Sequence, residues 1–367
     1  MARGIAVLIA AGLFLLEAPA AVAQEPPPRE FYGVVSQAKL GARDFEQMGA
    51  GQIGTVREML DWSEIDRSPV PNDYSWAKFD GVVAGAARQG VSVLPTLFSV
   101  PPWVSAVERC EAGEGPCQIT PPTSEVGLDA FSSFAAAAAR RYGNDGTFWA
   151  LHPELPEVPI DTWQIWNEPN SPGFWQPRPD VADYGRLLSA AAEGIREEDP
   201  AAEVILGGMF RYPLRGEKGG IRATDFLARL YQRPGIMADF DGVAVHPYAA
   251  RLKGVKRGIF RVVKVMAQAG DATTGLWITE IGWSSGGKPN PLNRGPKGQA
   301  SRLTQAYRWL AAQRVALGLR LVAWFAWRDT PLEESRCAWC ARSGLFRVDG
   351  VTPKPAWARL LEFTAAG

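Results

Sequence analysis

Two glutamates at the ends of apolar segments are the residues of this sequence best suited to chemistry. Glu168 lies in the run WNEPN, and Glu280 lies in the run ITEIGW. Carboxylates seldom end apolar strands without a partner or a task, because their desolvation is expensive. Two carboxyls that face each other could cut a glycosidic bond, since one protonates the leaving oxygen while the other attacks the anomeric carbon or activates water. A structural ion pair is the alternative for each glutamate.

Four further polar residues stand close to predicted strand ends, namely Arg57, Asn167, His246 and Tyr248. Arg57 would hold a neighbouring carboxylate ionised, because a nearby cation lowers a carboxylate's pKa; a purely structural arginine is the alternative. Asn167 could merely cap the turn that follows it. His246 is one of two histidines, and a lone histidine near a core is often just a satisfied polar residue. We expect no metal site, because the other histidine, His152, lies in a Pro-rich segment.

The chain contains 14 tryptophans, whose flat apolar faces are suitable platforms for sugar rings. We expect Trp327 to be such a platform at the end of the last strand, and packing over the barrel is the alternative for it. Trp283 is a candidate for an outer sugar subsite, as are Trp62, Trp103 and Trp175. Loop packing is an equally good interpretation of these four residues.

Eight apolar segments of strand length must position these residues. They are rich in Val, Ile, Leu, Trp and Phe without polar alternation, which is typical of strands buried on both faces. The predicted strands are Phe31–Val35, Gln52–Arg57, Ser92–Phe98, Thr162–Trp166, Glu203–Leu206, Gly242–His246, Leu276–Glu280 and Leu321–Trp327. Apolar residues at helical spacing predict helices over Tyr74–Gln89, Leu128–Tyr142, Val181–Glu198 and Ala300–Leu317.

Strands that alternate with helices predict parallel pairing through crossover connections. A closed barrel is favoured over an open sheet, because no Gly-x-Gly-x-x-Gly follows the first strand and the candidate residues stand at the ends of many strands. The length of 367 residues fits one such barrel with long loops. We therefore predict an α/β fold, a single (β/α)8 TIM barrel, with its active site at the carboxyl ends of the strands.

The N-terminal 23 residues are typical of a signal peptide. Arg3 provides positive charge, residues 5–16 are apolar, and the small residues Ala21, Val22 and Ala23 form a cleavage site. We expect a secreted, extracellular protein whose residues 24–367 form the catalytic barrel, with an uncleaved anchor as the alternative. No later apolar stretch is long enough to predict a transmembrane helix.

The four cysteines form two local pairs, Cys110 with Cys117 and Cys337 with Cys340. Export permits disulfides, so we expect each pair to close a short loop on the active-site face of the barrel. A zinc site formed by four thiolates is the alternative, although the first spacing does not match common zinc knuckles.

The charge balance limits the classes of partner. The chain has 39 basic and 39 acidic residues, a formal net charge of zero, and no basic stripe that stands out along the sequence. We therefore expect no nucleic-acid partner. We also expect that no cofactor is required.

Taken together, the strand-end residues closely resemble clan A of the glycoside hydrolases, with family 39 or family 5 nearest. The resemblance covers about Tyr32 to Trp357 and rests on the Asn-Glu-Pro run after the fourth strand and a glutamate ending the seventh. It implies that Glu168 is the acid/base and Glu280 the nucleophile. It also implies that Asn167 binds a sugar 2-hydroxyl, and that His246 and Tyr248 at the end of the sixth strand bind the nucleophile or the sugar. The tryptophan platform expected at Trp327 likewise follows from this resemblance.

The sequence therefore predicts a retaining hydrolase that acts on a β-linked oligosaccharide or polysaccharide. A transglycosylase that uses the same site is one alternative, because the sequence does not distinguish water from a sugar as the acceptor. A catalytically inactive glycan-binding protein on a barrel scaffold is another, since a fold alone does not prove activity.

Overall fold

One parallel sheet, whose strands lie in the order β5-β4-β3-β2-β1-β9-β8-β7-β6, closes on itself through pairing of β5 with β7. The computed structural model describes residues 25–70, 73–105, 119–211, 219–333, 335, 337 and 339–365. Within these residues the strands are β1 Tyr32–Val35, β2 Thr55–Asp61, β3 Ser92–Phe98, β4 Thr162–Ile165, β5 Glu203–Leu206, β6 Met209–Phe210, β7 Gly242–His246, β8 Gly275–Ile281 and β9 Leu319–Phe325. The two-residue strand β6 comes shortly after β5 and, like β5, pairs with β7, so β5 and β6 together fill one of eight strand positions. The predicted eight-stranded TIM barrel is therefore confirmed.

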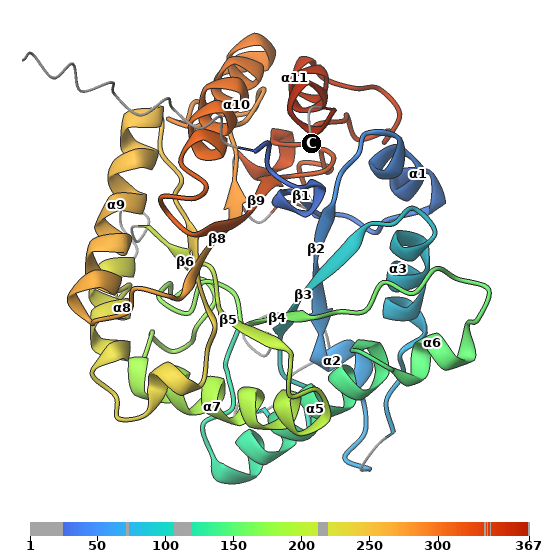
Figure 1. The fold of residues 1–367 in the computed structure, drawn as a ribbon, viewed down its shortest axis with the longest axis vertical. Coiled ribbons are helices and arrows are strands. Elements are labelled where there is room, and N and C mark those ends of the chain that lie inside the picture. The colour runs from blue at the N-terminus through green and yellow to red at the C-terminus, as the bar shows by residue number, and fades with distance from the viewer. Residues whose placement is uncertain are drawn as a thin grey trace, which may run out of the picture.

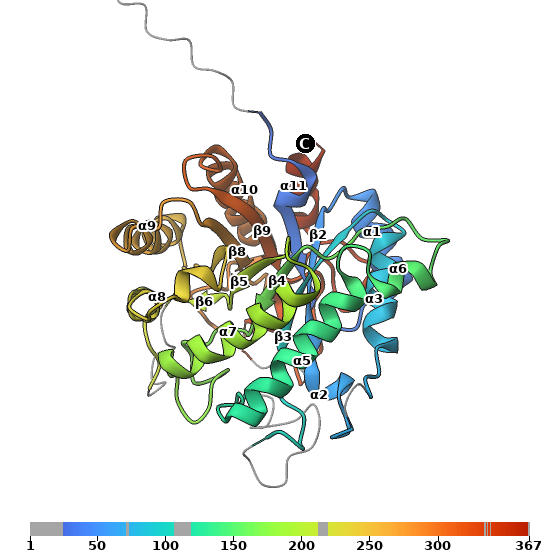
Figure 2. The ribbon, with the colours of Figure 1, turned by 60° about the horizontal axis from the view of Figure 1, so that its bottom comes forward.

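Helices surround the barrel, and all but the short α2 and α6 follow one another around it in chain order (Figures 1 and 2). They are α1 Ala42–Ala50, α2 Trp62–Ile65, α3 Ala77–Ala87, α5 Glu125–Tyr142, α6 Thr147–Leu151, α7 Val181–Glu198, α8 Ala223–Tyr231, α9 Leu252–Gln268, α10 Gly295–Ala312 and α11 Pro355–Thr364. Capping side chains mark the first residues of the long helices α5 and α7. The Ser124 side chain accepts from an N–H in the first turn of α5, and Asp180 does the same for α7.

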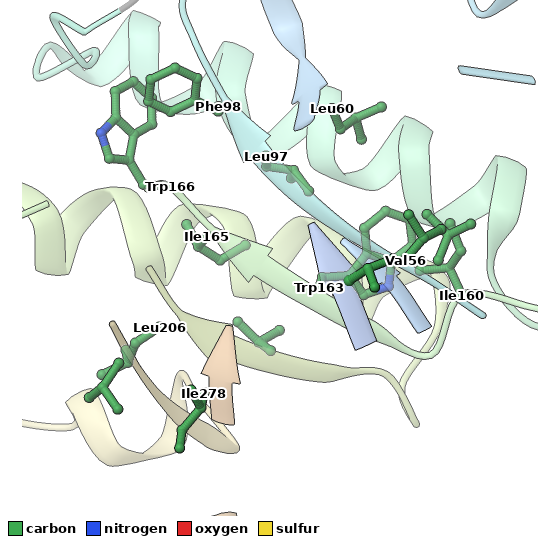
Figure 3. Packing of buried hydrophobic residues seen from close by; sticks show 14 of the residues in the cluster. Val56, Leu60, Leu97, Phe98, Ile160, Trp163, Ile165, Trp166, Leu206 and Ile278 are labelled. Carbon is green, nitrogen blue, oxygen red and sulfur yellow. The ribbon is translucent and has the colours of Figure 1, made fainter. Parts of the chain in front are cut away.

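The main core lies between the strands and the helices. Figure 3 shows part of it, where Leu60, Leu97 and Trp163 are completely buried. Full burial of such a side chain contributes about 1.5–3 kcal/mol, so this layer supplies most of the fold's stability.

A second, smaller core fills the interior of the barrel. The indole of Trp277 closes the end of the barrel at which the strands begin, because Gly242 and Gly275 leave it room. A Cβ atom at Gly242 would lie 2.3 Å from that ring. The polar residues described below therefore lie above an apolar floor.

Several predicted element boundaries are wrong by a few residues. The second strand continues to Asp61, so Arg57 lies within it and points into the barrel rather than ending it. The last strand ends at Phe325 rather than Trp327, and the short strand β6 was not predicted. The ranges Ser92–Phe98, Glu203–Leu206, Gly242–His246 and Val181–Glu198 are confirmed.

Some predictions fall on residues that the structure does not describe. The signal peptide over residues 1–23 and the Cys110–Cys117 pair both lie outside the described residues. The second predicted disulfide, Cys337–Cys340, is present. Among the described helices, none combines the length and the apolar character needed to cross a membrane.

Candidate active site

Glu168 reaches the mouth of the barrel through a turn that follows β4. Trp166 and Glu168 have φ angles of 69° and 43°, a left-handed conformation that side chains other than glycine rarely adopt. Such strain persists where the surrounding structure imposes it, and it is concentrated at functional sites. The turn brings the Glu168 carboxyl to 2.7 Å from Nδ1 of His246, at the end of β7.

Glu280 stands near the end of β8, on the other side of the mouth. Arg57 Nη1 donates to its Oε1 at 2.8 Å, and the Tyr248 hydroxyl donates to its Oε2 at 2.8 Å. Glu168 and Glu280 are each 7% exposed. One carboxylate oxygen of each and a ring nitrogen of His246 all lie within 4.8 Å of one another. The two glutamates singled out in the sequence are therefore a buried, facing pair.

Arg57 connects this pair to the strand beneath it. Its Nε donates to Gln164 Oε1 at 2.6 Å, and its Nη2 donates to Asn167 Oδ1 at 2.8 Å. The guanidinium thus orients three side chains at once, as its planar set of donors allows. Because the Asn167 oxygen faces Arg57, the amide NH₂ of that residue is the group that could donate to a sugar hydroxyl.

A chain of hydrogen bonds links Gln164 through Thr279 and His246 to Glu168. Gln164 Nε2 donates to Thr279 Oγ1 at 3.1 Å, and Thr279 Oγ1 lies 3.0 Å from His246 Nε2. The Thr279 hydroxyl can donate its proton to Nε2 while its oxygen accepts from Gln164, and this arrangement places the imidazole proton on Nδ1, where Glu168 accepts it. An added Cβ at Gly208 would lie 2.0 Å from Nε2, so the ring needs glycine there.

The groups that influence protonation differ between Glu280 and Glu168. Burial raises the pKa of Glu280, while the charge of Arg57 and the Tyr248 hydrogen bond oppose that rise. Burial, together with the charge of Arg57, lowers the pKa of His246 well below its usual 6.5, so the imidazole is neutral. Burial and the charge of Glu280 raise the pKa of Tyr248, which therefore keeps its proton and donates it. A cation thus contacts Glu280, whereas a neutral ring contacts Glu168.

The predicted tryptophan platform is wrong. Trp327 is completely buried, and its Nε1 donates to Asp44 Oδ1 at 2.8 Å. Trp283 is 1% exposed and packs against Trp324, so it presents no face to a sugar either. Of the other candidate subsite residues, Trp62 and Trp175 are also buried, and Trp103 is 37% exposed. Burial between strands and helices explains most of the tryptophan content.

Two other aromatic residues stand beside the carboxyl pair instead. Phe325, the last residue of β9, packs against the inner core of the barrel. Trp339 is partly exposed, and its ring lies 4.8 Å from that of Tyr248 and 5.5 Å from that of Phe325. Because the Tyr248 hydroxyl binds Glu280, these aromatic faces adjoin the reactive carboxylate.

Three residues of the site were not predicted from sequence although a signal was present. Gln164 is a polar residue between apolar neighbours in the run TWQI, and Thr279 immediately precedes Glu280 in an apolar strand. Polar groups in strands buried on both faces need hydrogen-bond partners, which here are the site residues. Phe325 alternates with Leu321 and Ala323 on the inward face of β9.

Glu168, His246 and Glu280 could also offer three ligand atoms to a cation. The charges around these three residues favour a pair of catalytic carboxyls over a cation site. Both oxygens of Glu280 already accept hydrogen bonds, and one of these comes from the fixed charge of Arg57. One guanidinium together with one proton would balance the two carboxylates, so a carboxyl pair needs no further cation for charge balance.

Solved structures of glycoside hydrolases have the same fold. A family 39 glycoside hydrolase from Bacteroides cellulosilyticus WH2 matches with a TM-score of 0.63 and 19% identity over 92% of this chain, which spans 64% of that chain. A family 39 β-xylosidase from Caulobacter crescentus matches with a TM-score of 0.64 and 18% identity, over 93% of this chain and 72% of the other.

A family 39 enzyme from Xanthomonas axonopodis pv. citri gives a TM-score of 0.65 and 16% identity, over 93% of this chain and 67% of the other. No protein-family model and no curated protein matches the chain. The resemblance to the clan A barrels, nearest to family 39, is confirmed as a resemblance of fold.

Proposed function

We propose that this protein is a retaining glycoside hydrolase in which Glu280 is the nucleophile and Glu168 is the acid/base. One observation carries the assignment: Arg57 contacts Glu280 at 2.8 Å, whereas neutral His246 contacts Glu168 at 2.7 Å. A cation stabilises the ionised form of its partner. The proton shared by the pair therefore resides on Glu168. Pairs of carboxyls with such different surroundings divide the acid and base roles between them.

In the first step the ionised Glu280 oxygen attacks the anomeric carbon, and the bond to the leaving oxygen breaks. Glu168 delivers its proton to that oxygen, so a neutral alcohol departs. The His246 Nδ1–H group remains hydrogen-bonded to Glu168 and stabilises the carboxylate that forms. Tyr248 and Arg57 hold both Glu280 oxygens, which orients the attacking atom.

In the second step Glu168 removes a proton from water, and the water oxygen attacks the anomeric carbon. The bond to Glu280 breaks, and the sugar leaves with its original anomeric configuration. No cofactor enters either step. Carboxyl groups about 5–5.5 Å apart are typical of this double displacement, and about 6.5–9.5 Å of inversion. The oxygens that lie within 4.8 Å here support retention.

The substrate proposed is a β-linked oligosaccharide or polysaccharide. The barrel similarity includes a family 39 β-xylosidase, which supports this linkage class. We also propose that the enzyme is secreted and acts outside the cell. The Cys337–Cys340 disulfide supports this location, because disulfides persist mainly in oxidising compartments.

The stereochemistry of the first-formed product tests the proposed function. Purified protein is supplied with a panel of aryl β-glycosides, and proton NMR follows the anomeric signal before mutarotation. The β-anomer is expected first. An α-anomer would mean that Glu280 acts as a base on water rather than as a nucleophile. Addition of an alcohol or sugar acceptor separates hydrolysis from transglycosylation, and absence of turnover on every substrate favours the glycan-binding alternative.

A further inference from the structure

Basic residues are concentrated in one third of the barrel, although the whole chain is neutral. Residues 251–320 contain thirteen Lys and Arg residues but only two acidic ones, Asp271 and Glu280. The expectation that no basic stripe stands out is therefore wrong, because a balanced total conceals an uneven distribution. This segment contains α9 and α10, which lie side by side on the outside of the barrel (Figures 1 and 2).

Helix α9 carries five cations and no acidic residue. Lys253 and Arg257 are exposed and four positions apart, as are Arg257 and Arg261. Like charges at this spacing destabilise a helix by a few tenths of a kcal/mol per pair. Among the described residues, no carboxylate oxygen lies within 4.0 Å of Lys253, Lys256, Arg257 or Lys264. Pairing with described carboxylates thus does not explain these four cations.

A cavity of about 610 Å³ opens between α8 and α9, within the size range of ligand sites. Four cations line it, namely Arg211, Arg222, Arg261 and Lys264, and none of its described lining residues is acidic. Arg211 follows β6 and lies against α9, where Gly258 leaves room: an added Cβ there would be 2.9 Å from the arginine side chain.

The cavity adjoins the proposed catalytic centre. His246, which contacts Glu168 within the barrel, also lines the cavity together with the following Pro247. The end of β7 therefore borders both. A polymer that crosses the barrel mouth would meet this basic wall next to the bond to be cut.

Aromatic side chains lie among these charges. Phe260 of α9 is 48% exposed and makes an edge contact with Trp309 of α10. The ammonium of Lys256 lies 5.0 Å from the centre of the Trp309 ring. Aromatic rings beside cations suit sugars that bear negative groups, since the ring packs on the apolar sugar face while the cation binds the anion.

We propose that the α8–α9 cavity and the exposed basic face of α9 form a binding site for an acidic polysaccharide, recognised through its carboxylate or sulfate groups. The choice of a polysaccharide among polyanions rests on the proposed function, since the site adjoins the carboxyl pair. The bound chain extends from the barrel mouth along α9, and its acidic groups pair with Lys253, Lys256, Arg257 and Lys264.

Binding to matched polymers tests this site. Full-length protein carrying Glu280→Gln is titrated with dextran sulfate, polygalacturonate and neutral dextran at several salt concentrations. We expect dextran sulfate, polygalacturonate or both to bind, depending on whether the site prefers sulfate or carboxylate groups. Neutral dextran is not expected to bind. The triple variant Lys253→Gln, Arg257→Gln, Lys264→Gln should bind about tenfold more weakly and show a shallower salt dependence.

A control triple variant, Arg43→Gln, Arg67→Gln, Arg88→Gln, removes the same charge from exposed positions elsewhere and should bind as the parent does. Equal weakening in the control would overturn the proposal, because total charge would then explain binding. So would equally tight binding of duplex DNA or anionic vesicles, binding of neutral dextran, or no binding of either acidic polymer. Hydrolysis of neutral aryl glycosides by the wild type tests the proposed function separately, because the binding assay requires no turnover.

Discussion

Arg57 is the residue on which the proposed division of roles between the two glutamates rests. It is completely buried, and its three donors contact Glu280, Gln164 and Asn167. A buried cation with three acceptors is well compensated, whereas loss of the cation leaves a buried carboxylate without its partner. The pH at which Glu280 ionises should therefore respond strongly to this position.

Arg57→Gln is expected to shift the acid limb of the kcat/KM profile to higher pH, because loss of the cation raises the pKa of Glu280. The rate at neutral pH should fall by about 10²–10³-fold. Arg57→Lys keeps the charge, so its acid limb should lie nearer that of the wild type. Near-UV circular dichroism checks that both variants fold. An acid limb that does not move in Arg57→Gln would show that the nucleophile does not depend on this cation.

Glu58 gives the stability of the protein a specific pH dependence. Burial raises its pKa from 4.5 to about 7, against the hydrogen bond from Ser36 and the charge of Lys78. The folded state thus binds the proton more tightly than the unfolded state. The stabilisation is complete below pH 4.5 and is lost as the pH rises through 7.

Urea unfolding at pH 5 and pH 8 measures this effect. From pH 5 to pH 8 the free energy of unfolding of the wild type should fall by about 2 kcal/mol more than that of Glu58→Gln, which cannot ionise. If the two proteins change in parallel, Glu58 does not titrate in this range.

Side-chain chemistry and strand ends were sufficient to predict most of the carboxyl site. Glu168 and Glu280 follow from carboxylates at the ends of apolar strands, whereas Asn167, His246 and Tyr248 were indicated by the resemblance to clan A. The aromatic residues were not predictable in the same way, because tryptophan serves equally well in a core. Whether a ring faces outward or into the barrel depends on strand register, which a continuous apolar run does not reveal.

At the scale of elements, the end of β9 illustrates this point. The run from Leu319 to Trp327 is apolar almost throughout, so its sequence alone does not show where the strand stops. In the structure the strand ends at Phe325, and the buried ring of Trp327 packs against Phe346. The loop that follows brings Trp339 back over Tyr248.

The Cys337–Cys340 disulfide is expected to act mainly by positioning Trp339, which lies inside its short loop. Replacing both cysteines by serine should raise KM severalfold with little change in kcat, because we expect Trp339, whose ring lies 4.8 Å from that of Tyr248, to bind the sugar rather than the reacting atoms. The loss of stability should be at most about 2 kcal/mol, since the closed loop is short.

Trp339→Ala should reproduce the rise in KM, and Trp339→Phe should largely restore the wild-type value. Steady-state kinetics on one aryl glycoside gives both parameters. An unchanged KM in Trp339→Ala would contradict a role for this ring in substrate binding.

At the scale of the whole molecule, the alternation of eight apolar strands with helices was enough to predict a closed barrel. The short strand β6, which pairs with β7, was beyond prediction because its two residues are too few to show a periodic pattern. The basic side of the barrel was visible in the sequence of residues 251–320, but the neutral total concealed it, because acidic residues elsewhere balance α9 and α10.

The barrel also explains how residues far apart in sequence act together. Arg57, Glu168 and Glu280 come from three separate strands or strand ends, and parallel strands bring their carboxyl ends to one face. The central claim is that the two glutamates have different roles there, and an acid and a nucleophile fail differently when they are removed.

The most direct test uses Glu168→Ala and Glu280→Ala with a dinitrophenyl β-glycoside and sodium azide. Without Glu168 the good leaving group still departs, and azide attacks the covalent intermediate, so a glycosyl azide of retained configuration is predicted. Without Glu280 no intermediate forms, and azide attacks directly from the vacated space to give the inverted product. Exchange of these two outcomes would reverse the assigned roles, and undiminished hydrolysis in both variants would place the active site elsewhere.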